Sequence, residues 1–272
     1  MTRKSILTFL CSFLITAGVA IGLNRFFSPT PNASPTPNAQ SGTLLIAAAA
    51  SLQNALEDID PLFKSAYPRI KVNYNFAASG TLQQQIEQGA PVDLFLSAAV
   101  RQMDTLEEKK LIVTHSRRNL LSNRLVLVVP RNSNLGLTGF RQLTNAKVKR
   151  ISMGEPRSVP AGQYAEEVFR NLGIWDRLRP KFVFGNSVRN VLGTVETGNA
   201  DAGIVYATDA RISDQITQVA TAPSNLHSPI VYPLAIVSAS RHQDAARLYA
   251  QFLAQDQALG VFRQYGFGLP SN

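Results

Sequence analysis

Ala47 to Asn54, with the sequence AAAASLQN, joins two different hydrophobic patterns. The apolar run that begins at Leu44 ends here, and from Leu52 onward apolar residues recur at the spacing of one helix face. The stretch therefore predicts a strand that gives way to a helix at Ser51. The first turn of a helix carries unpaired backbone N–H groups and the positive end of the helix dipole, so a junction of Ala and Ser offers hydrogen-bond donors to an anion.

Three further stretches repeat this arrangement of small residues or a hydroxyl before a helical pattern. They are FAASGT (Phe76 to Thr81), SVPAGQY (Ser158 to Tyr164) and GNSVRN (Gly185 to Asn190). A single serine at such a place is the ordinary N-cap of a helix. Four similar junctions in one chain favour a shared anion site.

The start of the chain predicts export. Residues 1–27 form a signal peptide or an N-terminal membrane anchor, because Arg3 and Lys4 precede an apolar segment from Ser5 to Leu23. Small residues from Gly18 to Ala20 offer a cleavage site, whereas the length of the segment suits a retained anchor, and both readings stay open. Residues 28–42 contain SPTPNA twice and predict an extended Pro-rich linker. We therefore expect the body of the protein in the periplasm.

The body alternates short apolar runs with helical patterns, which is typical of parallel sheets covered by helices. This pattern predicts an α/β fold of two lobes, each a mostly parallel sheet flanked by helices, with the ligand in the cleft between them. Lobe 1 is predicted to comprise residues 43–123 and 230–272, and lobe 2 residues 124–229. The second crossing between the lobes could lie anywhere between Ala207 and Ile230.

Composition excludes several other classes of protein. With 272 residues and 45% hydrophobic residues, the chain can build two folded domains. The formal net charge is +9, but without the basic residues of the leader 24 basic residues face 18 acidic ones. These basic residues are scattered, so we expect no nucleic-acid partner. The single cysteine, Cys11, lies in the leader and the three histidines lack ligand spacing, so we expect no disulfide, no metal site and no cofactor.

Six stretches of the chain together resemble the periplasmic molybdate-binding proteins that serve ABC transporters. They are AAASLQNAL (48–56), FAASGTLQQQIEQGAPVDLFLSA (76–98), VPAGQYAEE (159–167), LGIWDRL (172–178), GIVYATDA (203–210) and RQYGF (263–267). The resemblance implies the type II periplasmic-binding-protein fold. It also implies a protein that captures molybdate or tungstate and delivers it to the membrane subunits of an ABC transporter, and we expect it to act as a monomer.

The resemblance further implies five contacts to the oxyanion. Ser51 and Ser79 would offer hydroxyl and backbone donors, and Ala161 and Val188 would offer backbone N–H groups. Tyr206 would offer its phenol hydroxyl from the end of a strand. The first four lie on the junctions described above.

Four residues near the predicted contacts affect the expected shape and charge of the site. Gly80 stands where relatives often have a second serine, and Asn190 stands near a position where glycine is familiar, so both bear on loop shape. Arg157 and Arg189 flank two junctions. We hypothesise that they raise the local anion concentration from the rim, and ordinary surface charge is the alternative.

The donor set explains a preference for molybdate and tungstate, which are tetrahedral dianions without a proton at neutral pH. A pocket of donors without a carboxylate suits such ions. Hydrogen phosphate would bring a proton that finds no acceptor, at a cost of about 1–3 kcal/mol. Sulfate is also free of protons, so a transport protein for sulfate or another tetrahedral oxyanion is the alternative.

We expect no enzymatic activity. Ser79 lies in Ala78-Ser79-Gly80 without the G-x-S-x-G elbow of a hydrolase, and the chain has no phosphate-loop or dinucleotide fingerprint. A ligand-sensing regulator on the same scaffold would need a DNA-binding segment, whereas this chain begins with an export signal. Tyr164, which shares helical spacing with Val168, is predicted to belong to the core and not to the site.

Overall fold

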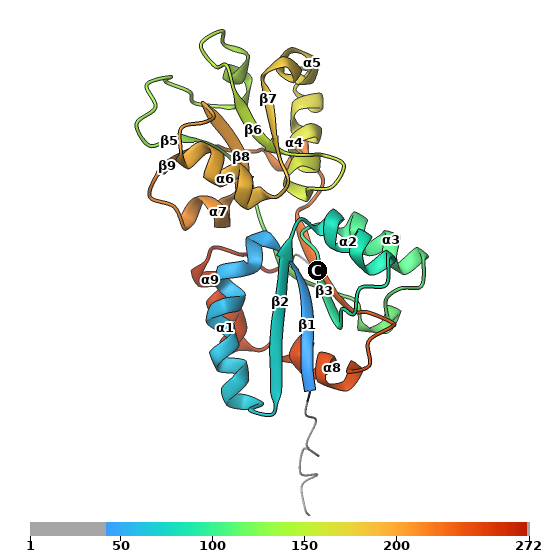
Figure 1. Cartoon of the computed structure of the whole chain (residues 1–272). Helices are drawn as coiled ribbons and strands as arrows, with labels where there is room; N and C mark the ends of the chain where they lie inside the picture. Colours follow the sequence, from blue (N-terminus) through green and yellow to red (C-terminus); the bar gives the residue numbers. More distant parts are fainter. Residues whose placement is uncertain (1–41, 271–272) are drawn as a thin grey trace, which may run out of the picture. The chain divides into compact units, whose positions relative to one another are not determined.

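The computed structural model describes residues 42–270, which form two five-stranded sheets covered by helices (Figure 1). Sheet 1 has the strand order β2-β1-β3-β10-β4, and sheet 2 has the equivalent order β7-β6-β8-β5-β9. We call each sheet with its helices lobe 1 and lobe 2. The leader predicted for residues 1–27 and the linker predicted for 28–42, except Gly42, lie outside the described residues.

The strands are short and mostly buried. Those of sheet 1 are β1 (Gly42–Ala49), β2 (Ile70–Ala77), β3 (Leu94–Leu96), β4 (Arg118–Ser122) and β10 (Val231–Ile236). Those of sheet 2 are β5 (Leu125–Pro130), β6 (Ile151–Gly154), β7 (Phe182–Gly185), β8 (Ala202–Tyr206) and β9 (Ile216–Thr221).

Helices follow most of these strands. The α-helices are α1 (Gln53–Ala66), α2 (Ser79–Glu87), α3 (Val100–Glu108), α4 (Pro160–Asn171), α5 (Trp175–Leu178), α6 (Val188–Glu196), α7 (Ala207–Arg211), α8 (Gln243–Phe252) and α9 (Asp256–Gln264). Short 3-10 turns are η1 (Ala50–Leu52), η2 (Thr114–Ser116), η3 (Phe140–Thr144), η4 (Arg179–Lys181) and η5 (Ser224–Leu226). Among residues 42–270, none of these helices combines the length and apolar content needed to cross a bilayer.

Each sheet contains one strand that runs against the other four. In sheet 1 this strand is β10, antiparallel to β3 and β4, and in sheet 2 it is β5, antiparallel to β8 and β9. Both reversed strands directly follow a passage of the chain from the other sheet. The predicted two-lobed α/β fold with mostly parallel sheets is confirmed, while the exact lobe bounds stay a prediction.

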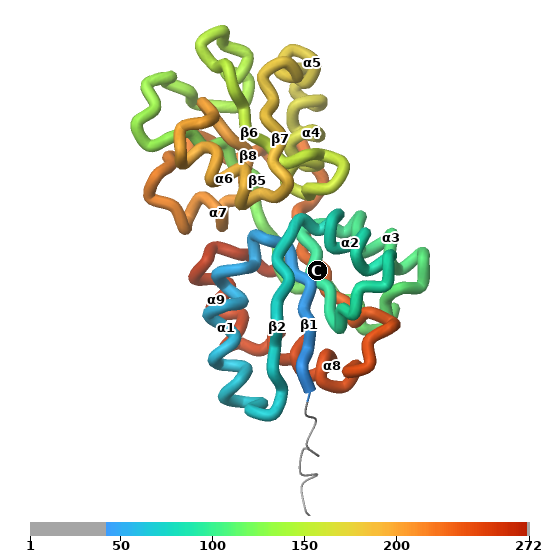
Figure 2. The backbone as a smooth tube through the Cα atoms, in the orientation of Figure 1, coloured from blue at the N-terminus to red at the C-terminus, as the bar shows by residue number. Residues whose placement is uncertain are grey.

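Strand β1 is apolar from Leu44 onward because this part of it is covered on both faces. Leu44 and Ile46 join a core that includes Phe63 of α1, whereas Ala47 joins a second core with residues of α2 and α3. Figures 1 and 2 show α1 and α9 side by side, with β2 drawn between them and β1. A strand that is buried on both faces carries a continuous apolar run. The apolar run that begins in β1 ends at Ser51, the first polar residue after Thr43.

The four predicted junctions are all present. η1 and then α1 follow β1, and α2 begins at Ser79, two residues after β2 ends. In lobe 2, α4 begins at Pro160 and α6 begins at Val188 after β7. Proline suits the first position of a helix because its missing N–H needs no intrahelical acceptor there.

Strand β10 contains a proline and remains continuous. Its register against β4 shifts between Tyr232 and Pro233. Proline cannot donate to a strand ladder, and a bulge is one of the places in a sheet that tolerates it. Bulges also bend a strand and redirect its side chains, and this one lies directly beside Tyr232.

Candidate functional site

The five predicted site residues line one small pocket. Lobe 1 lines it with the β1–α1 junction, the β2–α2 junction and Ala98, and lobe 2 with the start of α4, Val188 and Tyr206. Every residue lining this pocket is uncharged. The pocket has room for about one water-sized sphere. The structure thus brings together residues that lie far apart in the sequence.

The two serines of lobe 1 are buried and hydrogen-bonded from behind. The Ser79 hydroxyl oxygen accepts a 2.9 Å hydrogen bond from the backbone N–H of Ala98. The Ser51 hydroxyl oxygen lies 2.9 Å from the hydroxyl of Tyr232, and both residues are buried. Because the Ala98 amide can only donate, the hydrogen of the Ser79 hydroxyl remains free for another acceptor.

Lobe 2 contributes backbone donors. Ala161 is the second residue of α4 and Val188 is the first residue of α6. The N–H groups in the first turn of a helix have no intrahelical acceptor. Pro160 has no N–H, so Ala161 supplies the first backbone donor of α4. The helix dipoles add positive potential at the same place.

Tyr206 supplies the fifth polar group, at the end of β8. Its side chain is buried, and within residues 42–270 its hydroxyl has no hydrogen-bond partner. Burial raises the pKa of this phenol well above its usual value, so the hydroxyl keeps its proton. A buried polar group without a partner costs about 1–3 kcal/mol, and such groups commonly mark a ligand site.

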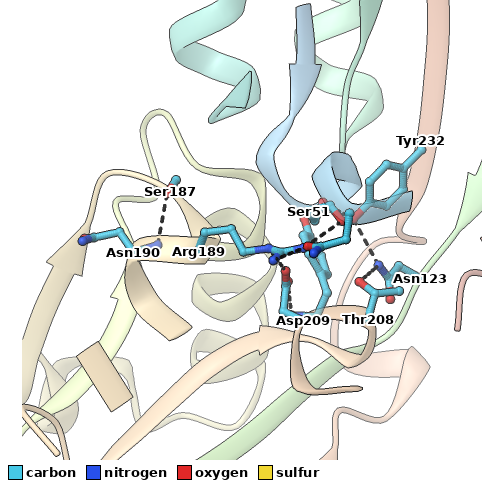
Figure 3. A network of polar contacts seen from close by, with 10 residues as sticks. Ser51, Asn123, Ser187, Arg189, Asn190, Thr208, Asp209 and Tyr232 are labelled. Atoms are coloured by element: carbon cyan, nitrogen blue, oxygen red, sulfur yellow. Dashed lines mark hydrogen bonds and ion pairs between the residues drawn. The ribbon is translucent and has the colours of Figure 1, made fainter. Parts of the chain in front are cut away.

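Arg189, which we hypothesised to attract anions from the rim, contacts residues of both lobes (Figure 3). Its Nη1 donates to Oδ1 of Asn54 at 2.8 Å. Its Nε lies 2.8 Å from Oδ1 of Asp209, close enough for an ion pair although the atoms do not align as a hydrogen bond. Arg157 forms an exposed pair with Glu155, which is consistent with ordinary surface charge.

Asp209 is a fully buried carboxyl group beneath the pocket. Besides the ion pair, it accepts a 3.2 Å hydrogen bond from the backbone N–H of Tyr206. Burial raises its pKa to about 6, and the nearby Arg189 opposes this increase. Sequence reasoning missed this residue: Asp209 lies within the matched stretch GIVYATDA, but nothing in its spacing indicates a buried ion pair.

Gly80 explains how closely the lobes approach. Its backbone N–H donates a 2.9 Å hydrogen bond to the carbonyl oxygen of Ser158 in lobe 2. A Cβ atom at this position would lie 2.5 Å from that oxygen. Glycine at position 80, where relatives often have serine, therefore permits a direct backbone contact between the lobes. A serine side chain would obstruct this contact.

Two further residues behind the pocket were missed. Tyr232 and Asn123 are linked by a hydrogen bond and approach Ser51 from the hinge region, where the chain passes between the sheets (Figure 3). Neither belongs to a recognisable motif, and they lie far apart in the sequence. Tyr164, by contrast, is buried in the core as predicted and does not line the pocket.

Comparison with known proteins identifies relatives across almost the whole described chain. The sequence model described as "Bacterial extracellular solute-binding protein" matches residues 44–268. The molybdate-binding protein ModA of Escherichia coli is 40% identical to this chain, and the match covers 84% of this chain and 90% of that protein. ModA of Haemophilus influenzae is 38% identical, and the match covers 84% of this chain and 91% of that protein. The periplasmic molybdate-binding protein of Azotobacter vinelandii shares the fold, with a TM-score of 0.75 at 22% identity over 84% of this chain and all of that structure.

Proposed function

Because the chain belongs to the bacterial extracellular solute-binding proteins, we propose that it captures molybdate outside the cytoplasmic membrane and delivers it to an ABC transporter. One observation carries the proposal. Ser51, Ser79, Ala161, Val188 and Tyr206 line a single uncharged pocket. The hydroxyl of Tyr206 has no partner there among the described residues, and a bound oxyanion would provide one.

The chemistry of this pocket suits a dianion that carries no proton. Its polar groups are hydroxyls and first-turn N–H groups, and no carboxylate lines it. Distributed dipoles can hold such an anion without a lysine or arginine in contact, which keeps binding reversible. The buried carboxylate of Asp209 is paired with Arg189, so its charge is compensated near the ligand.

The size of the pocket supports a small ligand and a mechanism of entry. The pocket is small, so we expect it to widen before a five-atom anion enters. Separation of two lobes about a hinge provides that opening, and closure then surrounds the anion with donors from both lobes. Release to the transporter would reverse this movement.

The finer features of the proposal concern the ligand range and the setting. We include tungstate because it has the same charge and shape as molybdate. The partners would be the membrane subunits of an ABC transporter, and the protein would act as a monomer without catalytic turnover. Its leader would either be removed or hold it at the outer face of the membrane.

Thermal unfolding of the purified protein with each oxyanion tests this function. A ligand that binds only the folded state at about 100 times its Kd adds about 2.7 kcal/mol, which corresponds to a rise in Tm of about 5–10 °C. We expect such a rise with molybdate and tungstate, little with sulfate and none with phosphate. Equal rises with sulfate and molybdate would favour a sulfate transporter, and no rise with any oxyanion would refute the proposal.

A further inference from the structure

The amide of Asn123 has a fixed orientation at the hinge. Its Oδ1 accepts a 2.8 Å hydrogen bond from the backbone N–H of Arg124, a group that can only donate. The amide oxygen must therefore face that N–H, and Nδ2 faces the other way. There it donates to the hydroxyl oxygens of Thr208, at 3.0 Å, and of Tyr232, at 3.1 Å.

This orientation determines the direction of the next hydrogen bond. The Tyr232 hydroxyl accepts from Asn123, so its own hydrogen must be donated elsewhere. Its other hydrogen-bond partner among residues 42–270 is the Ser51 hydroxyl, 2.9 Å away (Figure 3). Tyr232 is buried, and burial raises the pKa of its phenol, so the hydrogen is present at all physiological pH values.

The same reasoning reaches the pocket. Ser51 accepts from Tyr232, and its own hydrogen is then available to the pocket that it lines. Were Ser51 to accept a proton from a ligand instead, this hydrogen would be left buried without a partner, which is costly. The chain Asn123–Tyr232–Ser51, which we call the hydroxyl relay, thus runs in one direction, toward the ligand.

We infer that Asn123, acting through Tyr232, is the positioning residue that makes Ser51 a hydrogen-bond donor and so sets the preference of the pocket for anions without a proton. The inference rests on the proposed function and extends it to specificity. It assigns the rejection of hydrogen phosphate-like anions to a residue that does not line the pocket.

The Asn123→Asp variant tests the relay by reversing it. The carboxylate has nearly the same shape and accepts from Arg124, Thr208 and Tyr232, and three donors would keep it ionised. Tyr232 would then donate to the carboxylate and accept from Ser51, which would present a lone pair to the pocket. Selenate and hydrogen arsenate are suitable probes, because both are tetrahedral dianions of similar size and only the second carries a proton.

The measured quantity is the ratio of the two Kd values, obtained by competition against molybdate at mildly alkaline pH. Wild type should prefer selenate, and Asn123→Asp should shift the ratio toward hydrogen arsenate by at least about tenfold. The Asn123→Ala variant, whose relay can run either way, should give an intermediate ratio. The added charge weakens both dianions alike, so it cancels in the ratio.

Matched variants separate the relay from charge and folding effects. Asn54→Asp adds the same charge beside Arg189, at a residue with no hydrogen bond to Tyr232 among residues 42–270, and its ratio should stay near that of wild type. Tyr232→Phe breaks the relay, so Asn123→Asp should no longer change the ratio in that background. Tyr249→Phe removes another buried hydroxyl bonded to a tyrosine hydroxyl, at 2.9 Å, and controls for the cost to stability.

The outcomes are distinct. The inference is wrong if both Asn123 variants show the same ratio of Kd values for selenate and hydrogen arsenate as the Asn54→Asp control. It is equally wrong if hydrogen arsenate at the highest concentration still fails to displace molybdate from them. It is also wrong if Asn123→Asp shifts this ratio as much in the Tyr232→Phe background as it does in the wild-type background. Failure of wild type to bind molybdate would refute the proposed function itself, and the relay with it.

Discussion

Ser51 and Ser79 both open a helix of lobe 1 beside the pocket, yet their hydroxyls are held by different kinds of partner. Ser79 accepts from the backbone N–H of Ala98, whose direction is fixed by the chain. Ser51 meets the hydroxyl of Tyr232, which can donate or accept. Ser79, which is held by the backbone, is therefore a donor in any variant that folds. The role of Ser51, which is held by a side chain, depends on distant residues and can be changed by mutation.

The same contrast appears where the lobes meet. Beside Ser79, the backbone of Gly80 donates to the backbone of Ser158. Beside Ser51, the contact between lobes runs through the side chains of Arg189 and Asn54. We therefore distinguish a backbone-held half of the pocket, around Ser79, from a side-chain-held half, around Ser51.

The largest expected effect is a pH dependence confined to the side-chain-held half. Asp209 has a pKa of about 6 in the folded protein against an ordinary value of 3.8, so the folded state holds this proton more tightly. Stability from this group is present at low pH and is lost as pH rises between about 4 and 6. Relative to Asp209→Asn, wild type should lose up to about 3 kcal/mol of unfolding free energy across that window. Urea unfolding over a pH series measures the difference, and a difference independent of pH would contradict the assigned pKa.

The next effect concerns the backbone contact between the lobes. In Gly80→Ala, the new Cβ would press on the carbonyl of Ser158 and hold the lobes apart, so molybdate affinity should fall by about 1–3 kcal/mol. Gly193→Ala is the matched control, because its Cβ meets nothing within 4 Å on α6 and should leave affinity unchanged. Calorimetric titration compares the two, and equal affinities would show that the contact has no part in closure.

A smaller effect separates the two serines directly. Ser79→Ala leaves the N–H of Ala98 without its acceptor, and a backbone N–H cannot turn to find another. The ligand-free protein should lose about 1–2 kcal/mol of unfolding free energy. Unfolding by urea without any oxyanion measures this loss, and stability equal to that of wild type would mean that the bond is not needed to hold the empty pocket.

Ser51→Ala should have the smallest effect on stability. A water can take the place of the Ser51 hydroxyl and accept from Tyr232, so the ligand-free protein should lose less than about 1 kcal/mol. Molybdate affinity should nevertheless fall about as much as in Ser79→Ala, by roughly 1–3 kcal/mol, because each variant removes one donor to the anion. A larger stability loss in Ser51→Ala than in Ser79→Ala would reverse the comparison.

Much of the fold was predictable because strand and helix patterns are local. The run from Leu44 and the helical spacing after Ser51 indicate β1 and α1, and both are present. The reversed direction of β5 and β10 was not predictable from such patterns. The direction of a strand depends on where the chain passes between the sheets. A buried apolar run has the same sequence pattern in a parallel and in an antiparallel strand.

The pocket was predictable in part, for the same reason. Residues at helix starts and strand ends carry a local signal, and the resemblance of whole motifs added Tyr206. The residues behind the pocket carry no such signal. Asn123 lies in a short link between strands, and Asp209 resembles an ordinary first-turn acid. The role of Asn123 arises only when distant segments meet, as it meets Thr208. The role of Asp209 arises only when α6 brings Arg189 against it.

The crystal structure of the molybdate-loaded protein tests the central claim most directly. We predict that every protein atom in polar contact with the anion is a hydrogen-bond donor, supplied by Ser51, Ser79, Ala161, Val188 and Tyr206. A metal cation, a carboxylate oxygen or a lysine ammonium in direct contact with the anion would contradict the account.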